Sequence, residues 1–321
     1  MLRLSRPALL LLLAGLSASA LAKAPETVNI GYQKANIFAL LKYRGTLDES
    51  FKKQGIAVRW IEFPAGPQML EGLNVGAVFR RTVGSIALAA TGDAPPAFAQ
   101  AAQADLVYLA HSPANPKTEA IVVAENSAIK SVADLKGKRV GLNKGSDVNY
   151  LLVTALEKAG LSYKDITPVY LPPADARAAF QRGAIDAWVI WDPFLAEVET
   201  NAKARQIRNA EGLVPHYTFY LASRKFADTY PDTAKQVVDE LGKLSEWANG
   251  HQDDAAGILS TSTGLDKAIW LKTLARLPYG AERMTPAVYN EQQALADTFT
   301  RIGLLPVKVD VRSATWSLDK Q

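Results

Sequence analysis

Short apolar runs alternate with longer amphipathic stretches along most of this chain, and the two patterns predict different secondary structure. Residues 57–63 alternate small or apolar side chains with larger or charged ones, which is typical of a strand. Apolar positions from Ile37 to Phe51 recur instead at helical spacing. We predict strands at 28–33, 57–63, 85–90, 105–110, 119–124, 139–143, 167–171, 185–190 and 217–223, with helices between them. This alternation predicts an α/β fold with a mostly parallel sheet and helices on both faces.

Two breaks in the pattern divide the chain. Pro113 and Pro116 interrupt it within 112–116, and a second break follows near 212–216. Beyond the last strand, from Pro231 to about Gly303, the pattern is helical. We therefore expect two β/α lobes, one from residues 23–116 and 215–321, the other from 117–214. Two chain crossings make a two-strand hinge that lets the lobes close around a small ligand; the alternative is two rigidly packed domains.

Several of the predicted helices begin with turn residues directly after a strand. These turns are 64–67, 91–96, 144–146 and 191–193. Pro67 suits the first helical position because its missing N–H would be unpaired there, and Gly66 lets the backbone approach a ligand. Helix starts present free N–H groups that favour anions, and ligands of open α/β sheets bind beyond the carboxyl ends of strands. The sequence therefore predicts an anion site among these turns, unless they serve only as helix caps.

The first residues have the pattern of an export signal. Arg3 and Arg6 precede an apolar run over 8–16 that is too short to span a bilayer, and small residues follow up to Ala22. We predict a secretory signal peptide over residues 1–22, cleaved after Ala22, with Ala20 as the alternative. Its removal lowers the formal charge from +4 to about +2, and no second apolar span follows. We therefore expect a soluble, exported protein.

Composition excludes several classes of function. About 299 residues remain after cleavage, enough for two domains. The charges are dispersed without a basic tract, so we expect no nucleic-acid partner. Without cysteine the chain has no disulfide, no thiol nucleophile and no lipid anchor through an N-terminal Cys. His111, His216 and His251 lack metal-ligand spacing, so we expect surface or hinge histidines and neither a metal nor a cofactor.

Segments along nearly the whole mature chain closely resemble the aliphatic sulfonate-binding proteins. That resemblance implies the two-lobed periplasmic-binding-protein (type II) fold and a periplasmic, monomeric subunit without catalytic activity. It further implies that the protein delivers alkanesulfonates to the permease of an ABC importer, and through it to a cytoplasmic ATPase, for sulfur acquisition. The segments that carry the resemblance are 30–34, 62–70, 73–76, 91–96, 174–180 and 186–193, of which Phe-Pro-Ala-Gly-Pro and Trp-Asp-Pro are the most specific.

A sulfonate remains a monoanion at any ordinary pH, so its receptor needs oriented donors rather than a titrating base. Gln33, Thr91 and Ser146 are neutral side chains that provide such donors beside the helix starts. The organic tail needs an apolar wall, for which Trp191 with Phe194 is the candidate. Plain packing between the lobes is the alternative for Trp191.

Three charged residues complete the predicted site. Arg177 is either the one formal countercharge or part of a solvated helix face. Glu119 either orients a donor near the hinge or is simply paired, and Asp93 is expected to cap a helix because a carboxylate would repel a sulfonate. The predicted ligand-binding residues are Gln33, Gly66, Pro67, Thr91, Gly92, Glu119, Ser146, Arg177 and Trp191.

One segment departs from the family. Ala77–Gly84 is extra, and Ala87 stands where the family has an acid. Eight residues make about two helical turns, so either the helix is longer or the segment loops out. The lost acid changes the surroundings of the turn at Thr91.

Other ligands and one other class of protein stay open. Taurine, sulfate esters, nitrate and aromatic sulfonates are alternatives, because the sequence does not give the size of the pocket. A desulfinase and porphobilinogen deaminase resemble this fold, but both rely on a cysteine that this chain lacks. A synthase or binder of a pyrimidine precursor would have a His-rich pocket, which the sequence does not show.

Export yields a direct prediction. Mass spectrometry of the protein recovered from the periplasm should show a mature chain that begins at or near Lys23, because the small residues up to Ala22 form the cleavage site. Periplasmic protein that retained Met1 would contradict the signal peptide.

Overall fold

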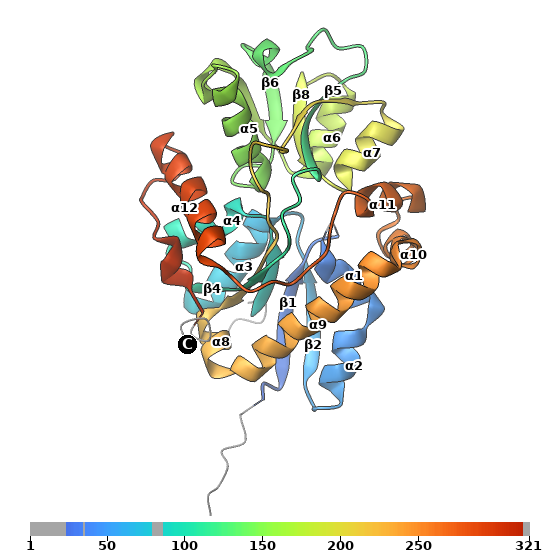
Figure 1. The fold of residues 1–321 in the computed structure, drawn as a ribbon, viewed down its shortest axis with the longest axis vertical. Helices are drawn as coiled ribbons and strands as arrows, with labels where there is room; N and C mark the ends of the chain where they lie inside the picture. The colour runs from blue at the N-terminus through green and yellow to red at the C-terminus, as the bar shows by residue number, and fades with distance from the viewer. Residues whose placement is uncertain (1–23, 35, 79–85, 317–321) are drawn as a thin grey trace, which may run out of the picture.

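The computed structural model describes residues 24–34, 36–78 and 86–316. These residues form two lobes, each built on a five-stranded sheet with helices packed against it (Figure 1). The two-lobed α/β architecture predicted from the sequence is thereby confirmed. Within the described residues, no helix combines the length and apolar character that a membrane span requires.

The sheet of the first lobe combines strands from both parts of the chain. β1 (Thr27–Tyr32), β2 (Ala57–Glu62), β3 (Leu88–Thr91), β4 (Leu106–His111) and β10 (Phe219–Ser223) lie in the order β2-β1-β3-β10-β4. β1 pairs in parallel with β2 and β3, whereas β10 runs antiparallel between β3 and β4. The return strand β10 therefore fixes the C-terminal part of the chain in the first lobe.

The sheet of the second lobe repeats this arrangement. β5 (Glu119–Val123), β6 (Arg139–Leu142), β7 (Thr167–Tyr170), β8 (Ala187–Trp191) and β9 (Arg205–Asn209) lie in the order β7-β6-β8-β5-β9. β5 and β8 are buried along their whole length, which agrees with their continuous apolar sequences. β9 was not predicted, because Arg-Gln-Ile-Arg-Asn is polar and lies half-buried at the sheet edge.

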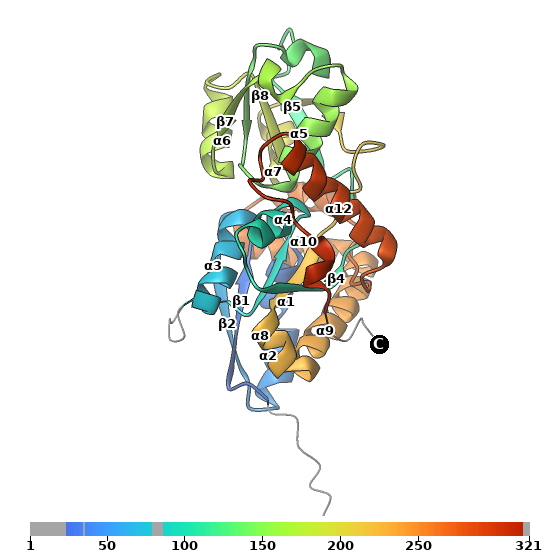
Figure 2. The same cartoon turned by 90° about the vertical axis from the view of Figure 1, so that its left-hand side faces the viewer.

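Helices cover both faces of the first sheet (Figure 2). One face packs against α1 (Ile37–Arg44), α2 (Thr46–Lys52), α8 (Arg224–Thr229), α9 (Pro231–Gly250), α10 (Gln252–Thr263) and α11 (Lys267–Leu274). The other packs against α3 (Gly66–Val78), α4 (Ala94–Ala101) and α12 (Pro286–Arg301). The second lobe has α5 (Asp147–Lys158), α6 (Pro173–Gln181) and α7 (Phe194–Asn201). Short 3-10 helices span Val132–Leu135, Tyr163–Asp165 and Val311–Ala314.

Two helical predictions need correction or lie outside the structure. The stretch predicted as one long helix is split into α1 and α2 at Gly45, whose φ of 74° ends the first helix in the left-handed region. Of the extra segment, Ala77 and Val78 complete α3, so the helix extends into it. Residues 79–84 lie outside the described residues.

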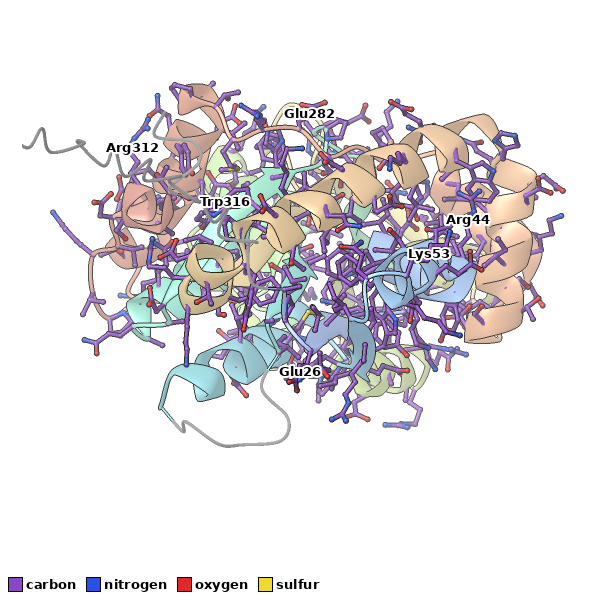
Figure 3. All side chains as sticks on the ribbon, turned by 90° about the horizontal axis from the view of Figure 1, so that it is seen from below. Glu26, Arg44, Lys53, Glu282, Arg312 and Trp316 are labelled. Atoms are coloured by element: carbon purple, nitrogen blue, oxygen red, sulfur yellow. The ribbon has the colours of Figure 1, made fainter. Side chains whose placement is uncertain are left out.

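Charged side chains outside the cleft serve the packing of the first lobe. Seen from below, Figure 3 shows Arg44 beside α9. Its guanidinium carbon lies 3.7 Å from the ring centre of Trp247 on that helix. The contact fastens the end of α1 to α9 through a cation–π interaction.

The two segments that connect the lobes lie side by side and are hydrogen-bonded to each other. The amide of Ser112 donates to the carbonyl of Thr218 at 2.8 Å, and the amide of Asn115 donates to the carbonyl of His216 at 3.0 Å. The buried Asn115 carboxamide donates further to Ser112 Oγ and to the carbonyl of Pro113. We call these segments, residues 112–118 and 210–218, the hinge.

Ion pairs join the lobes on both sides of the hinge. Arg276, which follows α11, bonds to Glu199 of α7 and lies 3.5 Å from Asp192 Oδ2. On the opposite side, Arg301 of α12 lies 2.8 Å from Glu157 of α5. The first of these links is mostly buried and the second is exposed, so the Arg276 link is screened less by salt.

The hinge predicts a measurable cost for losing Asn115. Asn115→Ala should lower the free energy of unfolding by about 1–3 kcal/mol, because Ser112, Pro113 and Thr118 lose a buried partner. Chemical denaturation of the unliganded protein measures this. Asn290→Ala, which removes an exposed amide on α12, is the matched control and should stay within about 0.5 kcal/mol of wild type. Equal effects of the two substitutions would show that the Asn115 network does not hold the hinge.

Candidate functional site

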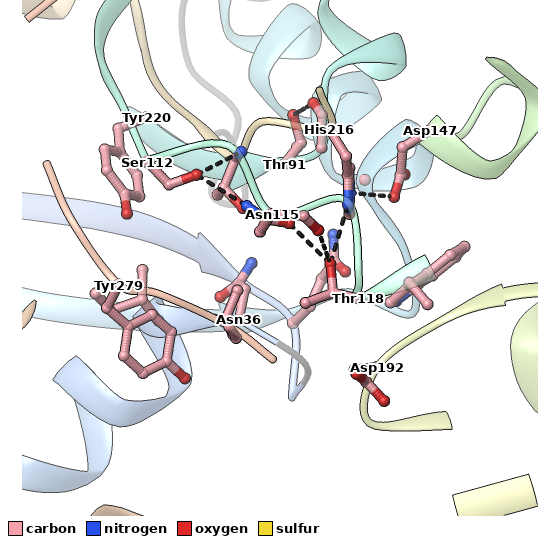
Figure 4. A pocket seen from close by; sticks show the side chains of 17 residues that line it. Asn36, Thr91, Ser112, Asn115, Thr118, Asp147, Asp192, His216, Tyr220 and Tyr279 are labelled. Carbon is pink, nitrogen blue, oxygen red and sulfur yellow. Dashed lines mark hydrogen bonds and ion pairs between the residues drawn. The ribbon is translucent and has the colours of Figure 1, made fainter. Parts of the chain in front are cut away.

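A cavity of about 60 Å³ lies between the lobes, against the hinge. Figure 4 shows its lining residues, which come from both lobes and from both hinge segments. Residues at the starts of several helices line it, and first-turn N–H groups have no partner within their own helix. These residues are Asn36 and Ile37 at α1, Gly66 at α3, Gly92 at α4, Asp147 at α5 and Asp192 at α7. The helix starts therefore give this cavity a positive dipole field that favours an anion.

Most of the residues proposed from the sequence gather here. Gln33, Gly66, Thr91, Gly92 and Trp191 line the cavity. Pro67 lines a second cavity next to it. Ser146 and Glu119 are buried and do not line the cavity themselves. Each precedes or follows a lining residue in the chain: Ser146 precedes Asp147, and Glu119 follows Thr118.

Several of these side chains are engaged in ways that the sequence does not show. The Ser146 hydroxyl donates to the carbonyl of Asn143 at 2.7 Å, and the Thr91 hydroxyl donates to the carbonyl of Gly92 at 3.0 Å. Trp191 is 8% exposed and meets Phe194 edge to face, with ring centres 6.3 Å apart. Phe194 itself is not among the residues that line this cavity.

Arg177 and Asp93 occupy positions that differ from those expected. Arg177 on α6 pairs with Glu197 on α7 and is not among the lining residues. Its charge is thus neutralised within the second lobe. Asp93 stands at the N-cap position of α4, but its buried side chain makes no capping hydrogen bond.

His216 lies in the site, although the sequence did not indicate it as a ligand-binding residue. It is a hinge residue, one of the two expectations for it, yet it is buried and lines the cavity. Its Nε2 lies 2.9 Å from Asp147 Oδ2, and its Nδ1 lies 3.0 Å from Thr118 Oγ1. Its backbone adopts a left-handed φ of 52°, which is rare for a residue other than glycine.

The hydrogen bonds around Thr118 assign the protonation of His216. Asn115 uses its Nδ2 donors on Ser112 and Pro113, so its Oδ1 faces Thr118 as an acceptor. The Thr118 hydroxyl lies 2.8 Å from both Oδ1 and the backbone oxygen of Asn115, and it must donate there. His216 Nδ1 then donates to Thr118, while Nε2 donates to Asp147. A ring that donates from both nitrogens is an imidazolium.

Burial and neighbouring charges shift the pKa values in this cluster. Burial raises the pKa of Asp93 to about 7, although the charge of His216 opposes the shift. Burial likewise raises the pKa of Glu119 well above its usual range, and neither of its carboxyl oxygens has a hydrogen-bond partner. Burial alone would lower the pKa of His216, but Glu119 and Asp147 outweigh it and raise that pKa. The hydrogen bonds assign the positive charge to His216, and burial favours the protonated form of Glu119.

The same cluster has the atoms of a possible metal site. Glu119, Asp147 and His216 each place one ligand atom within 4.8 Å of the others. A cation there would have to displace the proton that His216 Nε2 shares with Asp147. The hydrogen bonds thus favour a proton at this position over a metal ion.

The two lobes are in close contact at the cavity wall. A Cβ atom on Gly92 would stand 2.6 Å from Cγ of Asp147, so only glycine allows this approach between α4 and α5. Gly66 is equally constrained, since its Cβ would meet Pro95 Cγ at 2.9 Å. Both glycines stand in turns predicted from the sequence to form the anion site, and Gly66 was expected to allow close backbone approach.

Other lining residues were missed because no local pattern marks them. Ser112, Asn115, Thr118, Thr218 and Tyr279 come from the hinge segments and from the loop after α11. The proline-rich break at 112–116 was the available signal, and it indicated a connection rather than a binding surface. Asp147 was also missed, because the sequence indicated Ser146 as the polar residue at the start of this helix.

Comparisons with known proteins show the family of the chain. A family model described as NMT1/THI5 like matches residues 50–255. The aliphatic sulfonates-binding protein of Escherichia coli (strain K12) is 42% identical over 301 residues, which cover 93% of this chain and 91% of that protein.

Solved structures of similar sequence share the fold. The alkanesulfonate-binding protein SsuA from Xanthomonas axonopodis pv. citri, bound to MOPS, superposes with a TM-score of 0.85 at 42% identity and covers 92% of this chain and 99% of that chain. The periplasmic aliphatic sulphonate binding protein SsuA from Escherichia coli gives a TM-score of 0.80 at 41% identity, covering 92% and 93%. The chain therefore belongs to the NMT1/THI5-like family and, within it, to the aliphatic sulfonate-binding proteins.

Proposed function

We propose that this protein is a periplasmic solute-binding protein that captures aliphatic sulfonates between its lobes. It delivers them to the permease of an ABC importer, driven by a cytoplasmic ATPase, for sulfur acquisition. The observation that carries the proposal is the cavity against the hinge, on which several helix starts converge beside the imidazolium of His216. The names of the relatives support the same ligand class.

The size and donors of the cavity fit the head of a sulfonate. At roughly 10–15 Å³ for each water-sized group, 60 Å³ accommodates about four to six such groups. A sulfonate with its first carbon is of that size. Backbone N–H groups at the helix starts and the carboxamide of Gln33 are donors that need no change of protonation to hold a permanent anion.

The charges of the buried side chains beside the cavity nearly balance, so they do not prevent an anion from binding. The acid nearest the His216 ring after Asp147 is Glu119, with Oε2 4.0 Å from Nε2. Because burial keeps Glu119 protonated, the imidazolium and Asp147 nearly cancel, and the helix dipoles supply the remaining attraction. His216, rather than Arg177, is the cationic group beside the cavity, and Asp147 balances its charge.

We propose that the protein binds its ligand without turnover, and the chemistry present supports this. The sequence has no cysteine for nucleophilic attack. The His216 ring donates from both nitrogens, so it has no lone pair with which to act as a base. We propose that the subunit acts as a monomer and leaves chemistry to enzymes that receive the imported sulfonate.

The ligand class is tested by calorimetry on the mature protein. A short alkanesulfonate should bind saturably with one site per chain, and the carboxylate of matching length should bind at least about tenfold more weakly. The physical reason is that three sulfonate oxygens can engage donors from several helix starts at once. Taurine, nitrate and a sulfate ester are the comparison ligands. Tighter binding of a carboxylate than of every sulfonate would contradict the proposal.

The buried acids predict a pH dependence of stability. Glu119 has a raised pKa in the folded protein, so between about pH 4.5 and the neutral range the folded state keeps a proton that the unfolded state has lost. The free energy of unfolding should therefore fall as pH rises through that window. Glu119→Gln should reduce this slope by up to about 1.4 kcal/mol per pH unit, since an amide cannot ionise.

Denaturation of the unliganded protein at a series of pH values measures the slope. Asp93 and His216 still titrate in the variant, so part of the slope should remain. Glu125→Gln, an exposed acid after β5, is the matched control and should leave the wild-type slope unchanged. A Glu119→Gln slope equal to that of wild type would show that Glu119 is already ionised.

A further inference from the structure

A second cavity lies beside the one in the cleft, and it is larger and mostly apolar. Its volume is about 230 Å³, compared with about 60 Å³ for the cleft cavity. It occupies the groove between α3 and α4 and is covered by the loop that precedes α5. Pro67, Pro95, Phe98 and Ala102 from the first lobe face Gly145 from the second.

The two cavities share the same three helix starts. Each start contributes one residue to the cleft cavity and a near neighbour in the chain to the second cavity. At α3, Gly66 lines the cleft cavity and Pro67 lines the second cavity. At α4 the corresponding residues are Gly92 and Pro95, and at α5 they are Asp147 and Gly145. A ligand whose charged head lies at these helix starts therefore has the second cavity within reach of its following atoms.

The boundary between the cavities includes a contact between lobes. At that boundary the backbone of Gly92 approaches Asp147, and a Cβ on Gly92 would stand 2.6 Å from Cγ of Asp147. Because the partners belong to different lobes, this contact separates whenever the lobes open. A tail that crosses the boundary would keep Gly92 and Asp147 further apart than they are in this structure.

Phe98 gives the second cavity a fixed apolar wall. Its ring packs against Phe299 of α12, with centres 5.2 Å apart, so it is supported from behind. On the other side, a Cβ on Gly145 would meet the Phe98 ring at 3.6 Å, which shows how closely the second lobe covers it. Glu71 and Lys144 line the cavity as exposed residues and give it a polar mouth.

The cleft cavity offers less enclosed space for a long tail than the second cavity does. Its 60 Å³ is filled by a sulfonate and its first carbon. Trp191 lines this small cavity, and Phe194, expected beside it as a wall for the tail, lines neither cavity. The surface available to an apolar tail is therefore the groove between α3 and α4.

We propose that the groove between α3 and α4 is the subsite for the alkyl tail of the sulfonate. The proposal rests on the proposed function, because it requires the sulfonate head in the cleft. Trp191 then contacts the head and the first carbon, while Phe98 and the two prolines contact the chain beyond. Affinity should rise with chain length, since each methylene that enters the groove leaves water.

Calorimetry with methanesulfonate and octanesulfonate tests this. Wild type should bind octanesulfonate at least about tenfold more tightly than methanesulfonate, a gain that burial of two to three methylenes supplies. Ala102→Trp fills the groove from an exposed position and should reduce this ratio to about three or less. Ala99→Leu fills it from the adjacent position and should reduce the ratio in the same direction. Ala287→Trp, an equal substitution at an exposed alanine of α12, is the matched control and should keep the ratio.

Trp191→Ala separates this assignment from the earlier one. If Trp191 contacts only the head region, the variant should weaken both ligands by a similar factor and preserve the ratio. The subsite would be overturned if Ala102→Trp and Ala99→Leu kept the ratio of octanesulfonate to methanesulfonate affinity while Trp191→Ala abolished it. That result would show that the tail contacts Trp191. Equal affinity of wild type for both ligands would overturn the subsite and leave the proposed function intact. Failure of wild type to bind either sulfonate would overturn both.

Discussion

The structure depends on how it accommodates one buried positive charge at the hinge. An imidazolium removed from water is costly unless each of its protons meets an acceptor. His216 meets this condition with partners from different parts of the chain: Thr118 from the first hinge segment and Asp147 from the start of α5. The charge on the second hinge segment therefore ties the first hinge segment and the second lobe together.

The same partners set the shape of the binding cavity. Asp147 bonds to His216 and also meets the backbone of Gly92, so one carboxylate fixes both the hinge contact and the approach of the lobes. Residues at helix starts from both lobes then line one small space. Burial raises the pKa values of Asp93 and Glu119, and the imidazolium balances the charge of Asp147, so these acids repel an anion less than free carboxylates would.

The periphery of the cleft has a different character from its centre. The centre is polar, small and constrained by glycines, whereas the groove between α3 and α4 is apolar and larger. Ion pairs of Arg276 and Arg301 join the lobes on either side. A ligand with a permanent charge at one end and an apolar chain at the other matches this division.

The sequence by itself determined the α/β pattern, most strands and the turns that begin the helices around the cleft. These are local properties: apolar runs such as β8 stay buried in any packing, and Gly66 and Gly92 stand at turns that only small residues fit. Two breaks in the pattern indicated two lobes, and the resemblance to a known family supplied the periplasmic-binding-protein fold and the ligand class. The polar edge strand β9 was not predicted from the sequence, because its partial burial depends on the neighbouring elements.

Only the tertiary structure decided which charges face the ligand. The sequence indicated Arg177 as the possible countercharge and His216 only as a surface or hinge residue. In the structure Glu197 pairs with Arg177, while Thr118 and Asp147 contact His216. The partners of His216 are 98 and 69 residues away in the chain, so no local pattern shows them. The pKa of Glu119 follows from burial, and the groove that Pro67 lines forms only where α3, α4 and the second lobe meet. Burial and long-range contacts are properties of the packed chain, and they determine where the charge and the apolar surface of the site lie.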